Sequence, residues 1–238
     1  MTRFITIILV LLFNIAVNAQ PPKLVIEQVK GNAYIYTTWN TWQGNRIDAN
    51  GMYVVTDAGV VIFDNPWDST QLQPLFDSIW VRHQKKVIAA FSTHFHEDRT
   101  GGIDFYKSLS IPTYANEKTI DLCKKKNRNI PGNILEDDHE INIAGQRFEV
   151  FYPGPGHAPD NIVIYLTNEG ILYGGCFVKS IESKDLGNLG DADVKAWPAS
   201  IKNVIERFPK PVYVIPGHGS WKNNRGLEHT LALLNNNN

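Results

Sequence analysis

The sequence predicts an α/β fold in which two β-sheets pack face to face and helices cover the outside. The first observation is the order of elements. Two runs of strand-like segments are each followed by helix-like segments, and the two halves of the chain repeat this order. The second is the size of the core, because 43% of the 238 residues are hydrophobic, which suits one globular domain. The third is that His, Asp and Cys residues recur directly after predicted strands.

Short apolar or alternating segments, bounded by turn-forming residues, predict the strands of the first half. These strands cover residues 23–29, 33–38, 52–56, 60–63, 87–91 and 112–115. Apolar residues at helical spacing, in two cases after a capping Ser, Thr or Asn, predict the helices. They cover residues 70–83, 99–109 and 117–126. Residues 39–51 are polar and rich in turn formers, so we expect a loop there.

The second half repeats the pattern with shorter turns. Its predicted strands cover residues 140–143, 147–152, 161–166, 170–174 and 212–215. Its predicted helices cover residues 197–208 and 227–234. The element order therefore gives each sheet its own helices.

The N-terminus has the pattern of an export signal. A short basic start, Met1–Arg3, precedes an almost wholly apolar stretch over residues 4–17, and a small-x-small pattern predicts cleavage after Ala19. We therefore expect a signal peptide over residues 1–19 and a mature domain over residues 20–238. The apolar stretch is shorter than the ~20 residues that a membrane span needs, so no stable membrane association is expected after cleavage. A net charge of −1 disfavours a nucleic-acid partner.

The densest chemical signal lies directly after the predicted strand 87–91. His94, His96 and Asp98 fall within five residues and are followed by a Gly pair. Alternate residues of a strand-exit loop can converge on one point. Two imidazoles and a carboxylate that converge are ligands for a borderline metal, zinc above all.

Three further strand ends carry possible metal ligands. His157 lies in a Gly- and Pro-rich loop, Cys176 closes a strand, and His218 lies between two Gly residues. Six ligands are too many for one tetrahedral zinc. We therefore divide them into two sites, one of three histidines and one of mixed donors. The first is His94, His96 and His157, and the second is Asp98, Cys176 and His218. A zinc held by three histidines has an open position that can bind water, and the metal lowers the pKa of this water to about 7. Hydroxide is then available at neutral pH, which predicts metal-assisted hydrolysis of an acyl or phosphoryl compound.

Cys176 has an alternative interpretation. The chain has a second cysteine, Cys123, and two cysteines in an exported protein can form a disulfide. Cys123 lies in a predicted helix without a strand-end context, so the sequence favours Cys176 as a metal ligand.

With these residues in place, the chain resembles the subclass B1 metallo-β-lactamases, and the resemblance covers essentially the whole mature chain. The motif is His94-x-His96-x-Asp98-Arg99, whereas thioesterase-type relatives of the glyoxalase II branch carry a further His after the Asp. Cys176 stands where most members of the superfamily have a bridging Asp. Lys179 follows three residues later, and Asn188 lies beyond it.

The resemblance implies a four-layer αββα sandwich of two mixed sheets, with the site at one edge and two Zn²⁺ per chain. It implies zinc-dependent hydrolysis of the amide bond of penicillins, cephalosporins and carbapenems, hence antibiotic resistance, by an exported, periplasmic or secreted monomer. Lys179 would bind the substrate carboxylate, Asn188 would act near the lactam carbonyl, and Asp98 would orient the nucleophile. A mobile loop over residues 39–50 would contact substrate through Trp39 or Trp42; the alternative is that each Trp packs on the sheet.

Two other functions stay open at this point. One is a thioesterase or glyoxalase-II-like metallohydrolase on the same fold, against which Arg99 and Cys176 argue. The other is a zinc-binding protein without enzymatic activity, against which the open coordination position and Lys179 argue.

Overall fold

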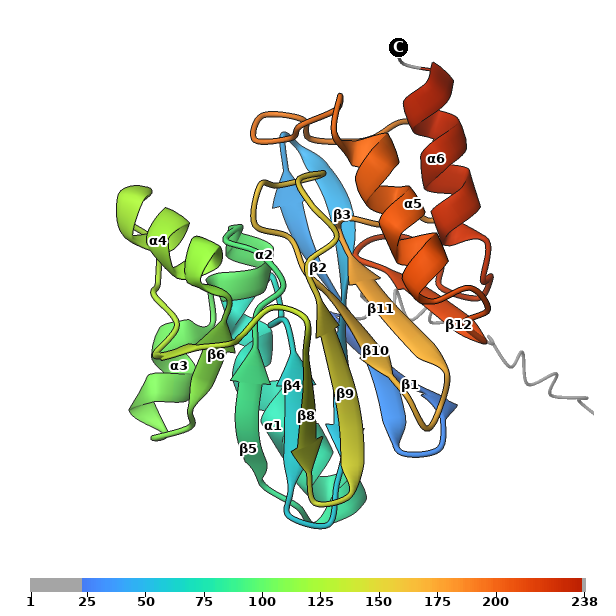
Figure 1. Cartoon of the computed structure of the whole chain (residues 1–238). Coiled ribbons are helices and arrows are strands. Elements are labelled where there is room, and N and C mark those ends of the chain that lie inside the picture. The colour runs from blue at the N-terminus through green and yellow to red at the C-terminus, as the bar shows by residue number, and fades with distance from the viewer. Residues whose placement is uncertain (1–22, 237–238) are drawn as a thin grey trace, which may run out of the picture.

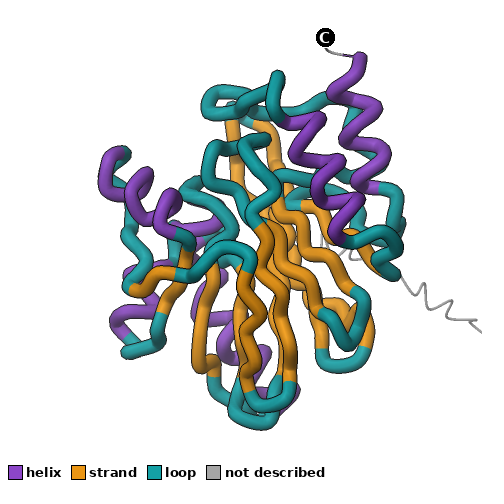
Figure 2. Tube along the Cα trace, in the orientation of Figure 1, coloured by secondary structure: helices purple, strands orange, loops and turns teal. Residues whose placement is uncertain are grey.

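Two facing β-sheets form the centre of the molecule, and helices lie outside both of them (Figure 1). The computed structural model describes residues 23–236, so the predicted signal peptide over residues 1–19 lies outside the described residues. Within them, one sheet has seven strands in the order β1-β2-β3-β4-β5-β6-β7, and the other has five in the order β12-β11-β10-β9-β8. Figure 2 shows the strands as central layers with helices at the periphery. The predicted αββα sandwich is confirmed.

The first sheet is antiparallel from β1 to β4 and parallel from β4 to β7. Its strands are β1 (Leu24–Lys30), β2 (Ala33–Trp42), β3 (Asn45–Val55), β4 (Val60–Phe63), β5 (Val87–Phe91), β6 (Thr113–Ala115) and β7 (Asn133–Ile134). The helical segments that follow β4, β5 and β6 are η1 (Ser69–Gln71), α1 (Leu72–His83), α2 (Glu97–Thr100), α3 (Ile103–Ser108) and α4 (Glu117–Lys125). The short β7 lies outside the strands that the sequence predicts.

The second sheet is antiparallel except for the pair β11 and β12, which is parallel. Its strands are β8 (His139–Ile143), β9 (Gln146–Phe151), β10 (Val163–Leu166), β11 (Ile171–Gly175) and β12 (Tyr213–Pro216). Helices α5 (Trp197–Arg207) and α6 (Gly226–Asn236) pack on its outer face (Figure 1). Strand β10 runs antiparallel to both of its neighbours, β9 and β11, and β12 runs parallel to β11. The strands β9, β11 and β12 therefore all end at the same edge of the sheet.

The main apolar core lies between the sheets. Alternate residues of each strand face inward, so that Phe63 of the first sheet meets Phe148 of the second at 5.2 Å between ring centroids. Separate apolar clusters lie beneath α5 and α6 on one side and beneath α1 and α3 on the other. Each sheet is therefore buried on both faces, which explains why β4 reads as a continuous apolar run.

Residues 39–50, predicted as a loop, form strand in the structure. β2 and β3 pair residue by residue from Ala33↔Val54 to Trp42↔Asn45. Gln43 and Gly44 make the turn, with φ values of 48° and 80°. This end of the hairpin extends beyond the core, and its large apolar residues Trp39, Trp42 and Ile47 are too widely spaced to give the alternation of a strand. The prediction of a loop was wrong for this reason.

The predicted helix over residues 99–109 is two helices, α2 and α3. The chain between them passes so close to α1 that a Cβ on Gly102 would lie 2.9 Å from Leu72 Cδ2. The Gly102 amide donates to Asn65 Oδ1 at 3.0 Å instead of continuing the first helix. Gly101 and Gly102 therefore end α2 shortly after the segment that carries His94, His96 and Asp98.

Gly51 is a position where the fold tolerates no side chain. A Cβ there would lie 2.2 Å from Tyr36 Cζ, and the Tyr36 hydroxyl is held by donation to Asp64 O at 2.7 Å. We expect Gly51→Ala to lower the free energy of unfolding by ~1–3 kcal/mol, because overpacking of a fixed ring forces a backbone shift. Urea denaturation measures the change. Gly132→Ala is the control, because a Cβ there makes only ordinary contacts, with Thr113 Oγ1 at 3.6 Å and Thr113 O at 3.9 Å. Equal losses in the two variants would contradict the packing argument.

Candidate metal centre

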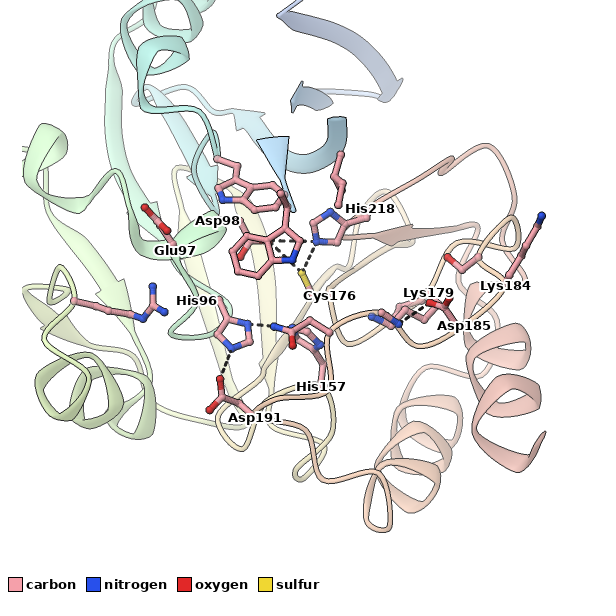
Figure 3. A pocket seen from close by; sticks show the side chains of 18 residues that line it. His96, Glu97, Asp98, His157, Cys176, Lys179, Lys184, Asp185, Asp191 and His218 are labelled. Atoms are coloured by element: carbon pink, nitrogen blue, oxygen red, sulfur yellow. Dashed lines mark hydrogen bonds and ion pairs between the residues drawn. The ribbon is translucent and has the colours of Figure 1, made fainter. Parts of the chain in front are cut away.

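The ends of four strands bring all six predicted ligands to one edge of the sandwich. His94, His96 and Asp98 follow β5 of the first sheet. The other three follow β9, β11 and β12 of the second sheet, whose ends coincide. Figure 3 shows His96 facing His157, and Asp98, Cys176 and His218 facing one another. The sequence-based grouping therefore corresponds to a real cluster in space.

The three predicted histidines converge through single ring nitrogens. His96 Nδ1 lies 3.1 Å from His94 Nε2 and 3.2 Å from His157 Nε2. Burial lowers the pKa of His94 and His157 well below the usual value, and it also lowers the pKa of His96. The three imidazoles are therefore neutral near pH 7, which is the form that binds a metal.

The mixed set converges in the same way. Asp98 Oδ2 lies 3.5 Å from Cys176 Sγ and 3.3 Å from His218 Nε2, and the last two atoms are 3.2 Å apart. His94, His157 and Cys176 also lie within 4.8 Å of one another through their donor atoms, so the two sets are adjacent. Cys123 and Cys176 are both free, so the disulfide alternative is excluded.

The donor atoms fit a borderline metal. One set offers three imidazole nitrogens, and the other offers a nitrogen, a carboxylate oxygen and a sulfur. Nitrogen and sulfur donors favour zinc and disfavour magnesium or calcium, which prefer oxygen.

Arg99 is the buried cation behind the mixed set. Its side chain is fully buried, and its Nη2 lies 2.8 Å from Asp98 Oδ2 and donates to Cys176 Sγ at 3.0 Å. Its Nη1 pairs with Asp64 Oδ2 at 3.2 Å. Burial alone would raise the pKa of Asp98, but the charges of Arg99 and His218 hold it well below its usual range. The sequence marks Arg99 only as a difference from thioesterase-type relatives, and its contacts with two predicted ligands were missed.

Further groups fix the orientation of the imidazoles. His96 Nε2 is 3.1 Å from Asp191 Oδ2, so Nδ1 is the nitrogen turned towards the other histidines. His218 Nδ1 is 2.5 Å from the backbone oxygen of Asp48, and His94 Nδ1 is 3.3 Å from Thr93 Oγ1. Such partners set the tautomer of a metal-binding histidine. Neither Asp191 nor Asp48 is distinguishable by spacing, so sequence reasoning missed both.

A cavity of about 350 Å³ opens in front of the cluster. Lys179, Asn188 and Trp42 line it, as the resemblance implies. Trp39 is not among the lining residues, and the Arg46 guanidinium lies 4.4 Å above its ring. The structure adds Trp67, whose ring centroid lies 6.0 Å from that of His218 and 6.2 Å from that of Trp42. The cavity therefore has an aromatic wall next to the mixed set and a cationic wall at Lys179.

The loop that carries His94 and His96 is anchored to α4 by a buried carboxylate. Asp160 Oδ2 accepts hydrogen bonds from the Phe95 amide at 2.8 Å and from Thr119 Oγ1 at 2.7 Å. Burial raises the pKa of Asp160 to about 6, although the hydrogen bonds from Thr119 and Phe95 oppose this shift. Between pH ~4 and ~6, Asp160 is therefore protonated in the folded protein, whereas an Asp in the unfolded chain, with a pKa of about 3.9, has already released its proton.

The pKa of Asp160 predicts a pH dependence of stability. The native state binds the extra proton on Asp160 between pH ~4 and ~6, so the contribution of this group to stability falls as pH rises through the window and is constant above it. Asp160→Asn keeps an acceptor for the Phe95 amide but cannot ionise. As pH rises across the window, the wild type should therefore lose about 3 kcal/mol of its free energy of unfolding relative to the variant. Urea titrations in excess chelator, which removes metal release as a cause, measure it. Parallel pH curves for the two proteins would contradict the prediction.

Comparison with known proteins identifies the family. Residues 45–218 match the model of the metallo-β-lactamase superfamily. The chain is 39% identical to the metallo-β-lactamase type 2 of Elizabethkingia meningoseptica, over 92% of this chain and 88% of that one. It is 41% identical to metallo-β-lactamase IND-1 of Chryseobacterium indologenes, over 92% of both chains. The crystal structure of metallo-β-lactamase IND-7 superposes with a TM-score of 0.88, at 40% identity, over 91% of this chain and all of that one.

The chain therefore belongs to the metallo-β-lactamase superfamily. Its relatives with type 2 and IND names confirm the predicted resemblance to subclass B1.

Proposed function

We propose that the protein is a zinc-dependent β-lactamase that hydrolyses the amide bond of penicillins, cephalosporins and carbapenems and so confers resistance. The observation that carries the proposal is the adjacency of the two donor sets at the base of a cavity that also presents Lys179. The thioesterase-like alternative is dropped, because relatives that align with 92% of the chain are metallo-β-lactamases.

Two zinc ions per chain match the donor groups. His94, His96 and His157 would hold one ion, and Asp98, Cys176 and His218 would hold the other. Zinc bound at these residues supplies a Lewis acid for the lactam carbonyl and a hydroxide nucleophile at neutral pH. The strain of the four-membered lactam ring explains why the protein needs no covalent nucleophile of its own.

Lys179 has the properties of a carboxylate anchor. Its side chain faces the cavity while the residue is only 9% exposed, and among residues 23–236 no carboxylate lies within ion-pair distance of it. Burial lowers its pKa, although the negative charges of Cys176 and Asp98 oppose the shift. An unpaired ammonium in a nearly buried position favours an anionic ligand, here the carboxylate on the fused ring of the antibiotic.

Asn188 and Asp98 act on the two sides of the scissile bond. Asn188 Oδ1 accepts from the Gly190 amide at 3.0 Å, so its Nδ2 is left to donate to the lactam carbonyl oxygen. Asp98 stays ionised because of Arg99, and an ionised carboxylate accepts a hydrogen bond from the attacking water and orients it. The resemblance assigns these roles, and the hydrogen bonds are consistent with them.

The proposal includes export. The predicted signal peptide over residues 1–19 would deliver a mature domain of residues 20–238 to the periplasm or the medium as a monomer. Among residues 23–236, the structure has no helix with the length and apolarity of a membrane span.

Removal of zinc should abolish the activity. We expect purified mature protein to hydrolyse a penicillin and a carbapenem, to lose at least 100-fold of its rate after dialysis against EDTA, and to regain it on addition of Zn²⁺, because both the Lewis acid and the nucleophile depend on the metal. Absorbance of the lactam measures the rate. Absence of hydrolysis of every β-lactam by protein with two bound zinc ions would overturn the proposal.

Replacement of Lys179 should weaken substrate binding more than turnover. We expect Lys179→Ala to raise KM for benzylpenicillin by about 10-fold or more, because loss of one partner of a desolvated charge pair leaves the substrate carboxylate unpaired. Lys184→Ala is the matched control, because Lys184 lines the same cavity but is exposed. A similar rise of KM in both variants would show a general effect of cavity charge and contradict the specific role.

A further inference from the structure

Arg128 lines the substrate cavity together with Lys179 and Lys184, and it lies on the side away from Lys179. Lys179 Nζ lies 5.3 Å from the Trp197 ring, whose centroid is 6.0 Å from that of His157. Arg128 Cζ lies 5.7 Å from the Phe95 ring, whose centroid is 4.5 Å from that of His96. Figure 3 shows Lys179 and His96 on opposite sides of His157. The cavity therefore runs from one cation, past both donor sets, to the other.

The backbone holds Arg128 in place. Beyond the C-terminus of helix α4, Asn127 lies in the left-handed region at φ 53°. The Arg128 amide then donates to Cys123 O at 2.9 Å. The Asn127 amide donates to Lys124 O at 3.2 Å. These two hydrogen bonds form a Schellman motif, which fixes the direction in which the chain leaves the helix. The Arg128 side chain consequently starts from a rigid point at the edge of the cavity.

The charge of Arg128 is not used within the described part of the chain. Its neighbour Lys126 forms an ion pair with Asp191 at 3.3 Å, but no carboxylate of residues 23–236 lies within ion-pair distance of Arg128. Its Nε is buried and has no hydrogen-bond partner among these residues. Glu97 lines the same cavity but is exposed and does not pair with it. A half-buried guanidinium in this state favours an anion that enters the cavity.

We propose that Arg128 binds an anionic group on the acylamino side chain of the substrate, so that the enzyme prefers β-lactams with two carboxylates over those with one. The inference rests on the proposed function. Once Lys179 holds the carboxylate of the fused ring and the lactam lies at the donor sets, the acylamino substituent points to the opposite side of the lactam. Arg128 and Phe95 are at that side. A carboxylate there meets the planar guanidinium, which can bind both of its oxygens.

The test compares two penicillins that differ by one side-chain carboxylate, benzylpenicillin and its α-carboxy derivative, with the zinc-loaded enzyme. The readout is the ratio of kcat/KM for the dianionic substrate to kcat/KM for the monoanionic one. We expect Arg128→Met to lower this ratio by about 3- to 10-fold, because a partly exposed charge pair is lost while an unbranched side chain is kept at the position. Arg128→Lys should restore part of the ratio.

Lys125→Met is the matched control. Lys125 is an exposed residue of α4, three positions from Arg128, and does not line the cavity, so this variant makes the same change in charge without a change at the site. We expect it to keep the wild-type ratio. A ratio unchanged in Arg128→Met, or lowered equally in Lys125→Met, would overturn the inference while leaving the proposed function intact. Failure of the wild-type enzyme to hydrolyse benzylpenicillin would instead overturn the proposed function.

Discussion

The buried guanidinium of Arg99 is the interaction on which the site depends. It contacts Asp98, Cys176 and Asp64, and it also donates to the backbone oxygens of Asn50 and Gly217. These groups come from both sheets. An unpaired charge in this position would cost several kcal/mol, whereas a charge whose Nη1 and Nη2 both have partners orders the loops that carry those partners. The cation therefore holds the ends of the two sheets together at the edge where the metal donors meet.

The two donor sets are kept ready for a metal by different physical means. Burial lowers the pKa of His94 and His157, so the first set is neutral without any help from a counter-charge. The second set contains an ionised carboxylate at Asp98, which is kept charged by Arg99 against the effect of burial. Metal binding needs deprotonated donors. Burial would lower the pKa of His218, but its interactions with Cys176 and Asp98 raise that pKa to about 10, so His218 gives up its proton only when a metal binds. The fold therefore supplies low dielectric on one side of the site and a fixed cation on the other.

The six predicted metal ligands could be found from the sequence because each one lies in the segment that follows an apolar run, and such a run is readily recognised as a strand. The residues that orient them could not be found in this way. Asp191 and Asp48 reach the site only through pairings between distant segments, and an isolated Asp in a polar segment has no distinctive spacing. The same limitation explains the strand over residues 39–50. Its backbone pairing extends past the core, so no apolar alternation marks it.

Lys179 and Arg128, at opposite ends of the cavity, differ in how firmly they are held, and this difference has a consequence for recognition. Lys179 is nearly buried above Trp197, whose Nε1 donates to Phe177 O at 3.1 Å, so its ammonium has little freedom. Arg128 is only half-buried, and its longer side chain rests near one ring, that of Phe95. The first arrangement suits a group that every substrate carries at one fixed distance from the lactam. The second suits a group whose position varies among substrates, because a flexible cation loses less when the fit is imperfect. The fixed end of the cavity therefore determines how the lactam is placed, and the flexible end adjusts the choice among side chains.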